Sequence, residues 1–346
     1  MKRQPGRADR TARTRALGSA CLLAAVFTTT ISRADDPLFV STIISPTAPP
    51  DYPAGIEGPA VDAAGNLYVV NFKRKGTIGR LKPGAAKSEL FTPLPDGSIG
   101  NGIRFDGAGR MYIADHKQQN IFFIEPGSTT PREYFKAHRN TEGRPQFNQP
   151  NDLAIARDGT LYASDPKAGD GIGQIWRITR GADGRGRGAI MSSTRGMGIT
   201  NGLDLSPDNK TLYVSESQFK RAHHPTRPAS IWAYRIDGTA LADPRRIFEF
   251  PDHDADGLRV DTDGRIFVAR PDHGTIALVT PDGHSEDKVT LHGKGPTNLT
   301  FGGPDGRDVY VTQSDGGFIE RFRTDRPGRE PCLRTPAPPD CRAIAQ

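Results

Sequence analysis

A short pattern recurs six times along the chain at nearly even spacing. In each repeat a Glu, Asn or Asp precedes a hydrophobic-aromatic pair by ten or eleven residues. The pairs lie 44, 50, 51, 54 and 43 residues apart and are Leu67-Tyr68, Met111-Tyr112, Leu161-Tyr162, Leu212-Tyr213, Ile266-Phe267 and Val309-Tyr310. Between the polar residue and the pair, apolar residues alternate and a turn sequence follows. This pattern predicts two antiparallel strands joined by a tight turn.

A period of about 40 to 50 residues made of strands and Gly/Asp turns is typical of β-propellers, whose blades are four-stranded sheets around a channel. Six repeats predict six blades. A further strand, from Leu38 to Ile44, precedes the first repeat and is expected to close the ring by joining the last blade. The predicted fold is all-β, a six-bladed β-propeller over residues 35–326.

The polar residues of the repeats occupy equivalent positions at the start of each first strand. If those strands line the channel, six side chains converge on one point of the axis: Glu57, Asn101, Asn151, Asn201, Asp256 and Asn298. Each alone could simply begin a strand, because Asn and Asp are common in turns and cap backbone groups. Six in register, two of them carboxylates, favour a functional centre.

The oxygens of this ring suit a hard cation. Ca²⁺ takes about six to eight oxygen ligands from carboxylates, amides and water. The sequence has no His/Cys pattern at the spacing of a structural zinc site. Ca²⁺ is therefore the expected cofactor, with Mg²⁺, Mn²⁺ or Zn²⁺ as alternatives.

The first 34 residues have the features of a secretory signal peptide: a basic start, an apolar stretch from Ala16 to Ile31 and a small-residue cleavage site ending at Ala34. The apolar stretch is too short to cross a bilayer. After cleavage, Cys332 and Cys341 remain as a pair in a Pro- and Arg-rich tail, residues 327–346, which is expected to be irregular. In an oxidising compartment they would form a disulfide; the alternative is two free thiols. The sequence predicts a periplasmic or secreted protein.

The basic character of the chain comes mostly from this leader. Seven of the 46 Lys and Arg residues and one of the 40 acidic residues lie in it, so the remainder carries equal numbers of both signs. That balance gives no reason to expect binding to nucleic acid or to an anionic membrane. We expect a small-molecule partner, no membrane insertion after cleavage, and a monomer or weak oligomer.

The loops that follow the hydrophobic-aromatic pairs are expected to overhang the polar ring, because the second strand of each hairpin returns to the face where the first began. Their charged side chains are candidate substrate contacts, although any one could be an ordinary solvated residue: His116, Lys167, His223, His224, Arg270 and His273.

Several short motifs, in this order and spacing, resemble the gluconolactonase and senescence-marker-protein family over nearly all of the chain after the leader. They are Glu57-Gly-Pro59, Pro150-Asn-Asp-Leu153 with Asp165-Pro166, Asn201-Gly202, Leu212-Tyr-Val-Ser215, Asp256-Gly257 and Pro296 to Gly303. The resemblance implies a six-bladed propeller that hydrolyses sugar lactones. It also implies a divalent metal held by Glu57, Asn151, Asn201 and Asp256. The segment from Lys167 to Asp170 departs from the family pattern, which leaves the sugar specificity open.

The function predicted from these residues is metal-dependent hydrolysis of a sugar lactone or related ester. The metal would polarise the carbonyl while an activated water attacks. Asp256 is the first candidate for activating that water, Asp152 the second, and His116 a candidate for proton transfer or orientation. Asn101, Asn151, Lys167 and His273 are the predicted substrate contacts. The alternatives are a non-catalytic sugar- or protein-binding propeller with a structural calcium, and a lyase or phosphotriesterase-like activity at the same metal.

Overall fold

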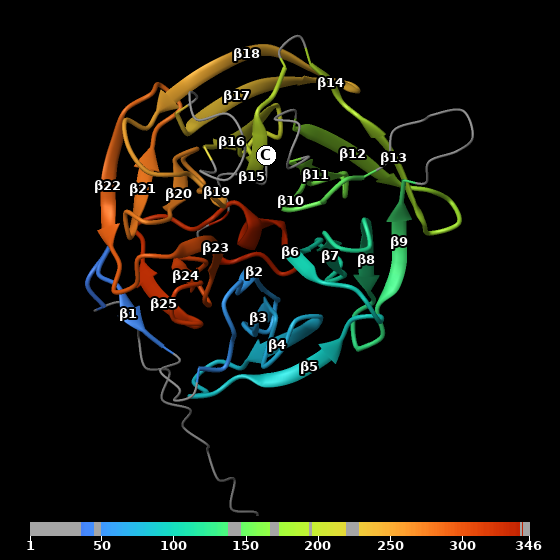
Figure 1. The fold of residues 1–346 in the computed structure, drawn as a ribbon, viewed down its shortest axis with the longest axis horizontal. Coiled ribbons are helices and arrows are strands. Elements are labelled where there is room, and N and C mark those ends of the chain that lie inside the picture. The colour runs from blue at the N-terminus through green and yellow to red at the C-terminus, as the bar shows by residue number, and fades with distance from the viewer. Residues whose placement is uncertain are drawn as a thin grey trace, which may run out of the picture. The chain divides into compact units, whose positions relative to one another are not determined.

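Six antiparallel sheets are arranged around a central axis in the computed structural model of the protein (Figure 1). The structure describes residues 36–44, 50–137, 147–166, 173–193, 196–218, 228–339 and 341. The predicted all-β, six-bladed propeller is confirmed. Within the described ranges no helix is long and apolar enough to span a membrane.

Each sheet is one blade, and in blades 1, 2, 3 and 5 the strands follow the chain outward from the axis. Blade 1 contains β2 (Glu57–Val61), β3 (Leu67–Val70), β4 (Thr77–Leu81) and β5 (Glu89–Pro93). Blade 2 contains β6 (Gly100–Phe105), β7 (Met111–Asp115), β8 (Asn120–Ile124) and β9 (Arg132–Lys136). Blade 3 contains β10 (Leu153–Ile155), β11 (Leu161–Asp165), β12 (Gln174–Arg180) and β13 (Gly186–Ile190).

Blade 4 has a fifth strand, because β14 (Ser192–Ser193) pairs in parallel with β18 (Ala240–Glu249). Its other strands are β15 (Ile199–Leu205), β16 (Thr211–Ser217) and β17 (Ser230–Asp237). Blade 5 contains β19 (Leu258–Val260), β20 (Ile266–Arg270), β21 (Thr275–Val279) and β22 (Ser285–Thr290).

Blade 6 closes the ring as predicted. It contains β23 (Pro296–Gly302), β24 (Asp308–Gln313) and β25 (Phe318–Arg323). The fourth strand is β1 (Thr42–Ile43), which pairs antiparallel with β25 through Thr42 and Arg321. The two ends of the propeller are thus joined by backbone hydrogen bonds in one sheet.

The hydrophobic-aromatic repeat serves the inner hairpin of each blade. In blade 1, Asp62 accepts hydrogen bonds from the backbone of Asn66 at 2.9 Å and from the hydroxyl of Tyr68 at 3.0 Å. Asp106 accepts the equivalent bonds in blade 2, from the backbone of Arg110 at 2.9 Å and the hydroxyl of Tyr112 at 3.2 Å. In blades 1 and 2 the tyrosine of the pair therefore anchors the turn that precedes it.

The hydrophobic core lies between neighbouring sheets and leaves the axis polar. Tyr112 and Ile121 of blade 2, for example, pack in one buried cluster with Leu161 and Trp176 of blade 3. Strand register also sets the faces of the disc: Glu57 lies opposite Val70, and Gly100 opposite Asp115. The loops after β3 and β7 therefore lie on the face where β2 and β6 begin, as expected from the sequence.

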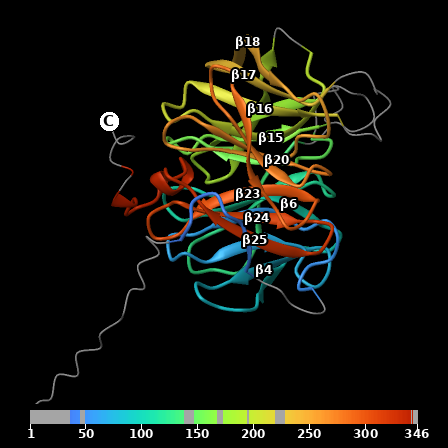
Figure 2. The ribbon, with the colours of Figure 1, turned by 90° about the vertical axis from the view of Figure 1, so that its left-hand side faces the viewer.

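The C-terminal segment is folded against the propeller, and its described backbone is mostly irregular. It includes the 3-10 helix η2 (Glu330–Leu333), on one side of the disc in Figure 2. Cys332 and Cys341 form a disulfide, as their pairing predicts. Three residues of the segment contact all six blades, through Val61, Arg104, Ile155, Asp204, Val260 and Phe301.

Candidate active site on the propeller axis

The starts of the first strands lie close together around the axis. The Gly102 amide donates to the Asn151 carbonyl at 2.8 Å, which joins blades 2 and 3. The Gly257 amide donates to the Thr297 carbonyl at 2.8 Å, and the Thr297 hydroxyl donates to the Ile56 carbonyl at 2.9 Å. These bonds join blades 5, 6 and 1, so the polar residues beside them face one small region.

In blades 1 and 2 a glycine follows the polar axial residue, and it allows neighbouring first strands to approach closely. Gly58 has φ of +59°, and a Cβ there would lie 1.9 Å from the Asn101 carbonyl oxygen. A Cβ at Gly102 would lie 2.8 Å from the Asn151 carbonyl oxygen. Neighbouring first strands therefore approach one another more closely than any residue with a side chain would permit.

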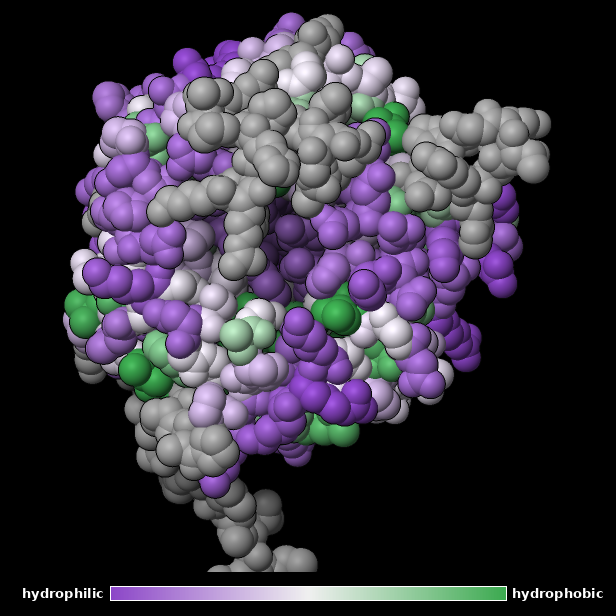
Figure 3. All heavy atoms as spheres, in the orientation of Figure 1, coloured by the Kyte–Doolittle hydropathy of each residue, from purple (hydrophilic) through white to green (hydrophobic). Residues whose placement is uncertain are grey.

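Four of the six predicted axial residues are partly exposed: Glu57, Asn101, Asn151 and Asp256. Asn201 and Asn298 are buried, at 2% and 1% exposure. Figure 3 shows a hollow near the centre of the face on which the first strands begin, surrounded by hydrophilic side chains. These four partly exposed residues are the axial residues that a bound substrate can contact.

The two axial carboxyl groups have raised pKa values. Burial raises the pKa of Glu57 to about 7, although hydrogen bonds from the Gly58 amide, Asn298 and Thr297 oppose the shift. Burial also raises the pKa of Asp256 well above its ordinary value, and the nearby charges of Glu57, Asp254 and Asp152 add to the effect. Without a cation, both groups are thus driven toward the protonated form.

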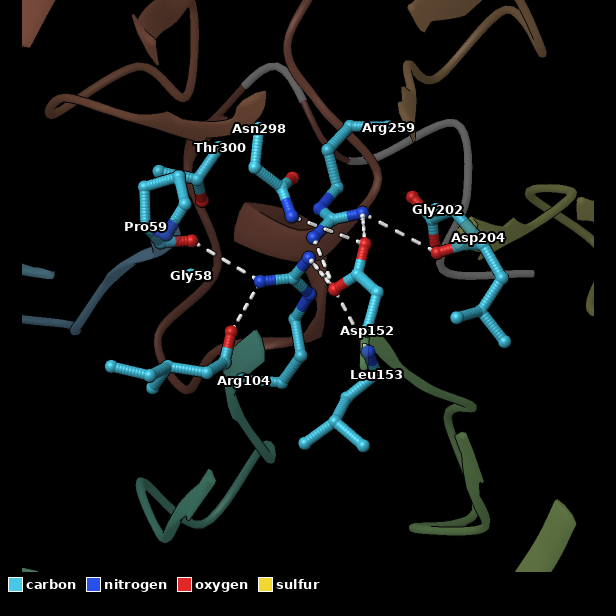
Figure 4. Close-up of polar contacts among 12 residues, drawn as sticks. Gly58, Pro59, Arg104, Asp152, Leu153, Gly202, Asp204, Arg259, Asn298 and Thr300 are labelled. Carbon is cyan, nitrogen blue, oxygen red and sulfur yellow. Dashed lines mark hydrogen bonds and ion pairs between the residues drawn. The ribbon is translucent and has the colours of Figure 1, made fainter. Parts of the chain in front are cut away.

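Asp152 lies in a buried ionic network rather than at the surface of the hollow (Figure 4). Its Oδ1 accepts hydrogen bonds from Arg104 Nη2 at 2.8 Å and Arg259 Nη2 at 2.9 Å. Its Oδ2 accepts from Arg259 Nη1 at 2.9 Å and from Asn298 Nδ2 at 3.4 Å. Asp152 therefore links blades 2, 3, 5 and 6 through side chains that are almost completely buried.

The C-terminal segment completes this network from the opposite end of the channel. Glu330 Oε1 lies 2.8 Å from Arg104 Nε and 3.8 Å from Arg259 Nε. Arg329 Nη2 lies 2.6 Å from Asp204 Oδ1. The network therefore pairs three guanidinium groups with three carboxylates.

Glu57 and Asp256 stand outside these pairs: neither forms an ion pair with any basic residue in the described ranges. Two carboxylates on one axis, with raised pKa values, fit a divalent cation that would neutralise both. The amide oxygens are placed consistently, because Asn201 Nδ2 donates to Ser217 Oγ at 3.0 Å and leaves its Oδ1 as a possible ligand. Asn101 Oδ1 is buried without a hydrogen bond from the described residues. The residues present thus fit the predicted metal.

The charged loop residues that were predicted as substrate contacts fall into three groups. His116 lies after β7, where burial, together with Lys75 and Lys117, lowers its pKa, opposed by Asp115. Arg270 and His273 contact the loop before β19: Arg270 Nη2 lies 3.0 Å from Asp252 Oδ1, and His273 Nε2 lies 3.9 Å from Asp252 Oδ2. Lys167, His223 and His224 lie outside the described residues.

Sequence reasoning missed the two axial arginines. Arg104 stands between Ile103 and Phe105, and Arg259 between Leu258 and Val260, each inside an otherwise apolar first strand. Burying a charge in such a strand costs much free energy unless the charge is paired. An arginine within an apolar first strand was therefore the sequence signal that could have predicted a buried ion pair. Arg329 and Glu330 gave no comparable signal, because they lie within a Pro- and Arg-rich stretch that is typical of a solvated tail.

Comparison with known proteins places the fold in a family. The family model described as the SMP-30/gluconolactonase/LRE-like region matches residues 56–315. A gluconolactonase from Zymomonas mobilis is 26% identical over 298 residues, which cover 78% of each chain. The solved structure of a gluconolactonase from Xanthomonas campestris has a TM-score of 0.64 at 22% identity, covering 81% of this chain and 88% of that one.

A third comparison concerns a calcium-binding protein. The solved structure of regucalcin from Agrobacterium tumefaciens has a TM-score of 0.65 at 18% identity, covering 84% of this chain and 96% of that one. At these identities the two solved structures establish the propeller fold.

Proposed function

The chain belongs to the SMP-30/gluconolactonase/LRE-like family, and on this premise we propose that it hydrolyses a sugar lactone or a related ester on the propeller axis. The observation that carries the proposal is the pair Glu57 and Asp256, two carboxylates at the hollow without an ion-pair partner among the described residues. The Zymomonas mobilis relative is a gluconolactonase, which supports a lactone as the substrate class.

In this proposal Glu57 and Asp256 hold a divalent cation together with the amide oxygens of Asn151 and Asn201. Ca²⁺ is the first choice because all four donors are hard oxygens. The cation would supply electrophilic polarisation of the substrate carbonyl. Asn101 and the exposed part of Asn151 orient the substrate from the neighbouring blades.

Asp256 is the proposed proton acceptor for the attacking water. Asp256 is a partly exposed residue, and its carboxylate has two oxygens, of which one is sufficient to hold a cation. Asp152 does not enter the mechanism, because both of its oxygens accept bonds from guanidinium groups. Burial raises the pKa of Asp152 to about 7, but its two oxygens are directed at Arg104 and Arg259 and away from the hollow, so the geometry and not the pKa excludes it as the proton acceptor.

We also propose that the protein acts outside the cytoplasm. The leader predicted at residues 1–34 lies outside the described residues, so the support for export is the sequence of that leader and the disulfide between Cys332 and Cys341. A hydrolase with a disulfide-bonded C-terminal segment is consistent with an oxidising compartment.

The test is a hydrolysis assay over aldonolactones, aryl esters and organophosphates, with and without EDTA and with Ca²⁺ restored. Asp256→Asn is expected to keep Ca²⁺ binding measurable by calorimetry and to lower turnover by about 10²- to 10⁴-fold, the usual contribution of a general base. Asp263→Asn, at an exposed turn, is the matched control and should keep full activity.

Two results would count against the proposal. Full lactonase activity in Asp256→Asn would exclude Asp256 as the proton acceptor. A calcium-loaded protein without activity on the whole panel would favour a non-catalytic sugar- or protein-binding propeller, whereas turnover of organophosphates alone would favour phosphotriesterase-like chemistry.

A further inference from the structure

Two histidines and an aspartate meet on loops of blade 5. Asp252 and His253 lie in the connection from β18 to β19, and His273 lies in the turn between β20 and β21. One possible ligand atom from each lies within 4.8 Å of the other two. In the described part of the chain, this is the single such group of His, Cys and acidic residues.

From this arrangement we propose a second metal site, formed by Asp252, His253 and His273, that binds a borderline transition metal such as Zn²⁺ in preference to Ca²⁺. Imidazole nitrogens favour Zn²⁺, Ni²⁺ and Cu²⁺, whereas Ca²⁺ requires a shell of oxygens. Two imidazoles and one carboxylate are a common protein contribution to a zinc site with an open position.

The distances are close to those that a tetrahedral metal needs. Metal bonds of about 2.1 Å at the tetrahedral angle separate two ligand atoms by about 3.4 Å. Asp252 Oδ2 lies 3.2 Å from His253 Nδ1 and 3.9 Å from His273 Nε2. The rings of His253 and His273 are 5.0 Å apart between centroids and inclined by 57°. Small rotations of the side chains would therefore complete the site.

Surrounding groups orient two of the three ligands. Arg270 Nη2 donates to Asp252 Oδ1 at 3.0 Å and to the Asp252 carbonyl at 2.6 Å, so that Oδ2 faces the histidines. Arg270 is itself 3% exposed, with its guanidinium 3.7 Å from the centre of the Phe250 ring. His273 Nδ1 forms a hydrogen bond with Thr275 Oγ1 at 2.9 Å, which directs Nε2 toward Asp252. Such outer contacts are typical of metal-bound histidine.

The site is open to solvent and chemically separate from the axial one. The side chains of Asp252, His253 and His273 are 50%, 36% and 27% exposed, so a metal can enter and keep water in its remaining positions. Asp256 lies in the same connection, but the proposed axial site uses only oxygen ligands, whereas this site offers two imidazole nitrogens. Loss of one metal therefore need not remove the other.

The experiment uses Co²⁺ as a visible probe of this site in purified, tag-free protein saturated with Ca²⁺. Wild type should bind one Co²⁺ with the absorption bands of nitrogen-ligated cobalt, and Zn²⁺ should displace it. His253→Ala and His273→Ala should each weaken binding by at least about tenfold, since even outer contacts contribute about 10- to 100-fold. His284→Ala, which changes a histidine that is 85% exposed, is the control and should bind as wild type does.

Thr275→Val separates ligation from orientation, because it should weaken Co²⁺ binding less than either histidine variant. Three results would overturn the proposal. They are no Co²⁺ binding by wild type at millimolar concentration, unchanged binding in a His253→Ala/His273→Ala double variant, and release of bound Co²⁺ when the free Ca²⁺ concentration is raised to that of Co²⁺. None of these measurements depends on hydrolytic activity, so the second site can fail while the proposed lactonase stands, or the reverse.

Discussion

The ion pair between Asp204 and Arg329 tests whether the C-terminal segment stabilises the propeller. The two groups are 2.6 Å apart, and each is 1% exposed. Asp204 also accepts a hydrogen bond from the Val260 amide at 2.9 Å. Asp204→Asn keeps the shape of the side chain but leaves the Arg329 guanidinium buried without its counter-charge.

Removing one partner of a buried ion pair typically costs about 3–5 kcal/mol of folding free energy. At roughly 2 °C per kcal/mol for a large domain, the midpoint of thermal unfolding should fall by roughly 6–10 °C. Three residues earlier, Arg326 pairs with Asp263 at 2.9 Å, with both side chains 50% exposed. Asp263→Asn is therefore a matched control, with an expected loss below about 1 kcal/mol.

The assay is equilibrium urea unfolding at pH 7 in excess Ca²⁺, with thermal unfolding as a second measurement. The double variant Asp204→Leu/Arg329→Met should lose less stability than Asp204→Asn, because no buried charge is left unpaired. Equal losses in Asp204→Asn and Asp263→Asn would show that the C-terminal segment does not hold a buried charge pair, and would refute the reasoning.

Three other predictions follow from the site, the ring and the C-terminal segment. Because the folded chain raises the pKa of Glu57 to about 7, it holds a proton that the unfolded chain releases. Unfolding temperatures in EDTA should therefore fall as pH rises from about 4.5 to 7, and Ca²⁺ should reverse that trend; a flat profile would contradict the shift. Gly58→Ala, whose Cβ would meet the Asn101 carbonyl, should lose several times the stability lost by Gly84→Ala, which has φ of +74° and open space; equal losses would count against the close approach. Serine at both Cys332 and Cys341 should lower stability by roughly 2–3 kcal/mol, and the mass of protein from the native host should show a disulfide and an N-terminus near Asp35; free thiols or a retained first residue would argue against export.

The local regularities of the chain were sufficient to predict the propeller. A strand, a Gly/Asp turn and a second strand are close in sequence, so their hydrogen bonds leave a periodic trace, as Asp62 and Tyr68 do in blade 1. The equivalent positions of Glu57 and Asp256 followed from the same period. The closing strand was predictable because one segment of apolar residues remained outside the six repeats.

Which charges lie beside the axis was decided only by the tertiary structure. Arg329 and Asp204 are 125 residues apart, and Arg259 and Asp152 are 107 residues apart. Such pairs leave no periodic trace, because each depends on how separate strands and the C-terminal segment meet after the ring has closed. For the same reason the sequence alone suggested Asp152 as a catalytic candidate. The folded protein instead surrounds it with arginines. The repeat in the sequence determines where the blades form. Burial in the folded protein determines which charges are removed from water and must therefore pair with a charge from another blade or from the C-terminal segment.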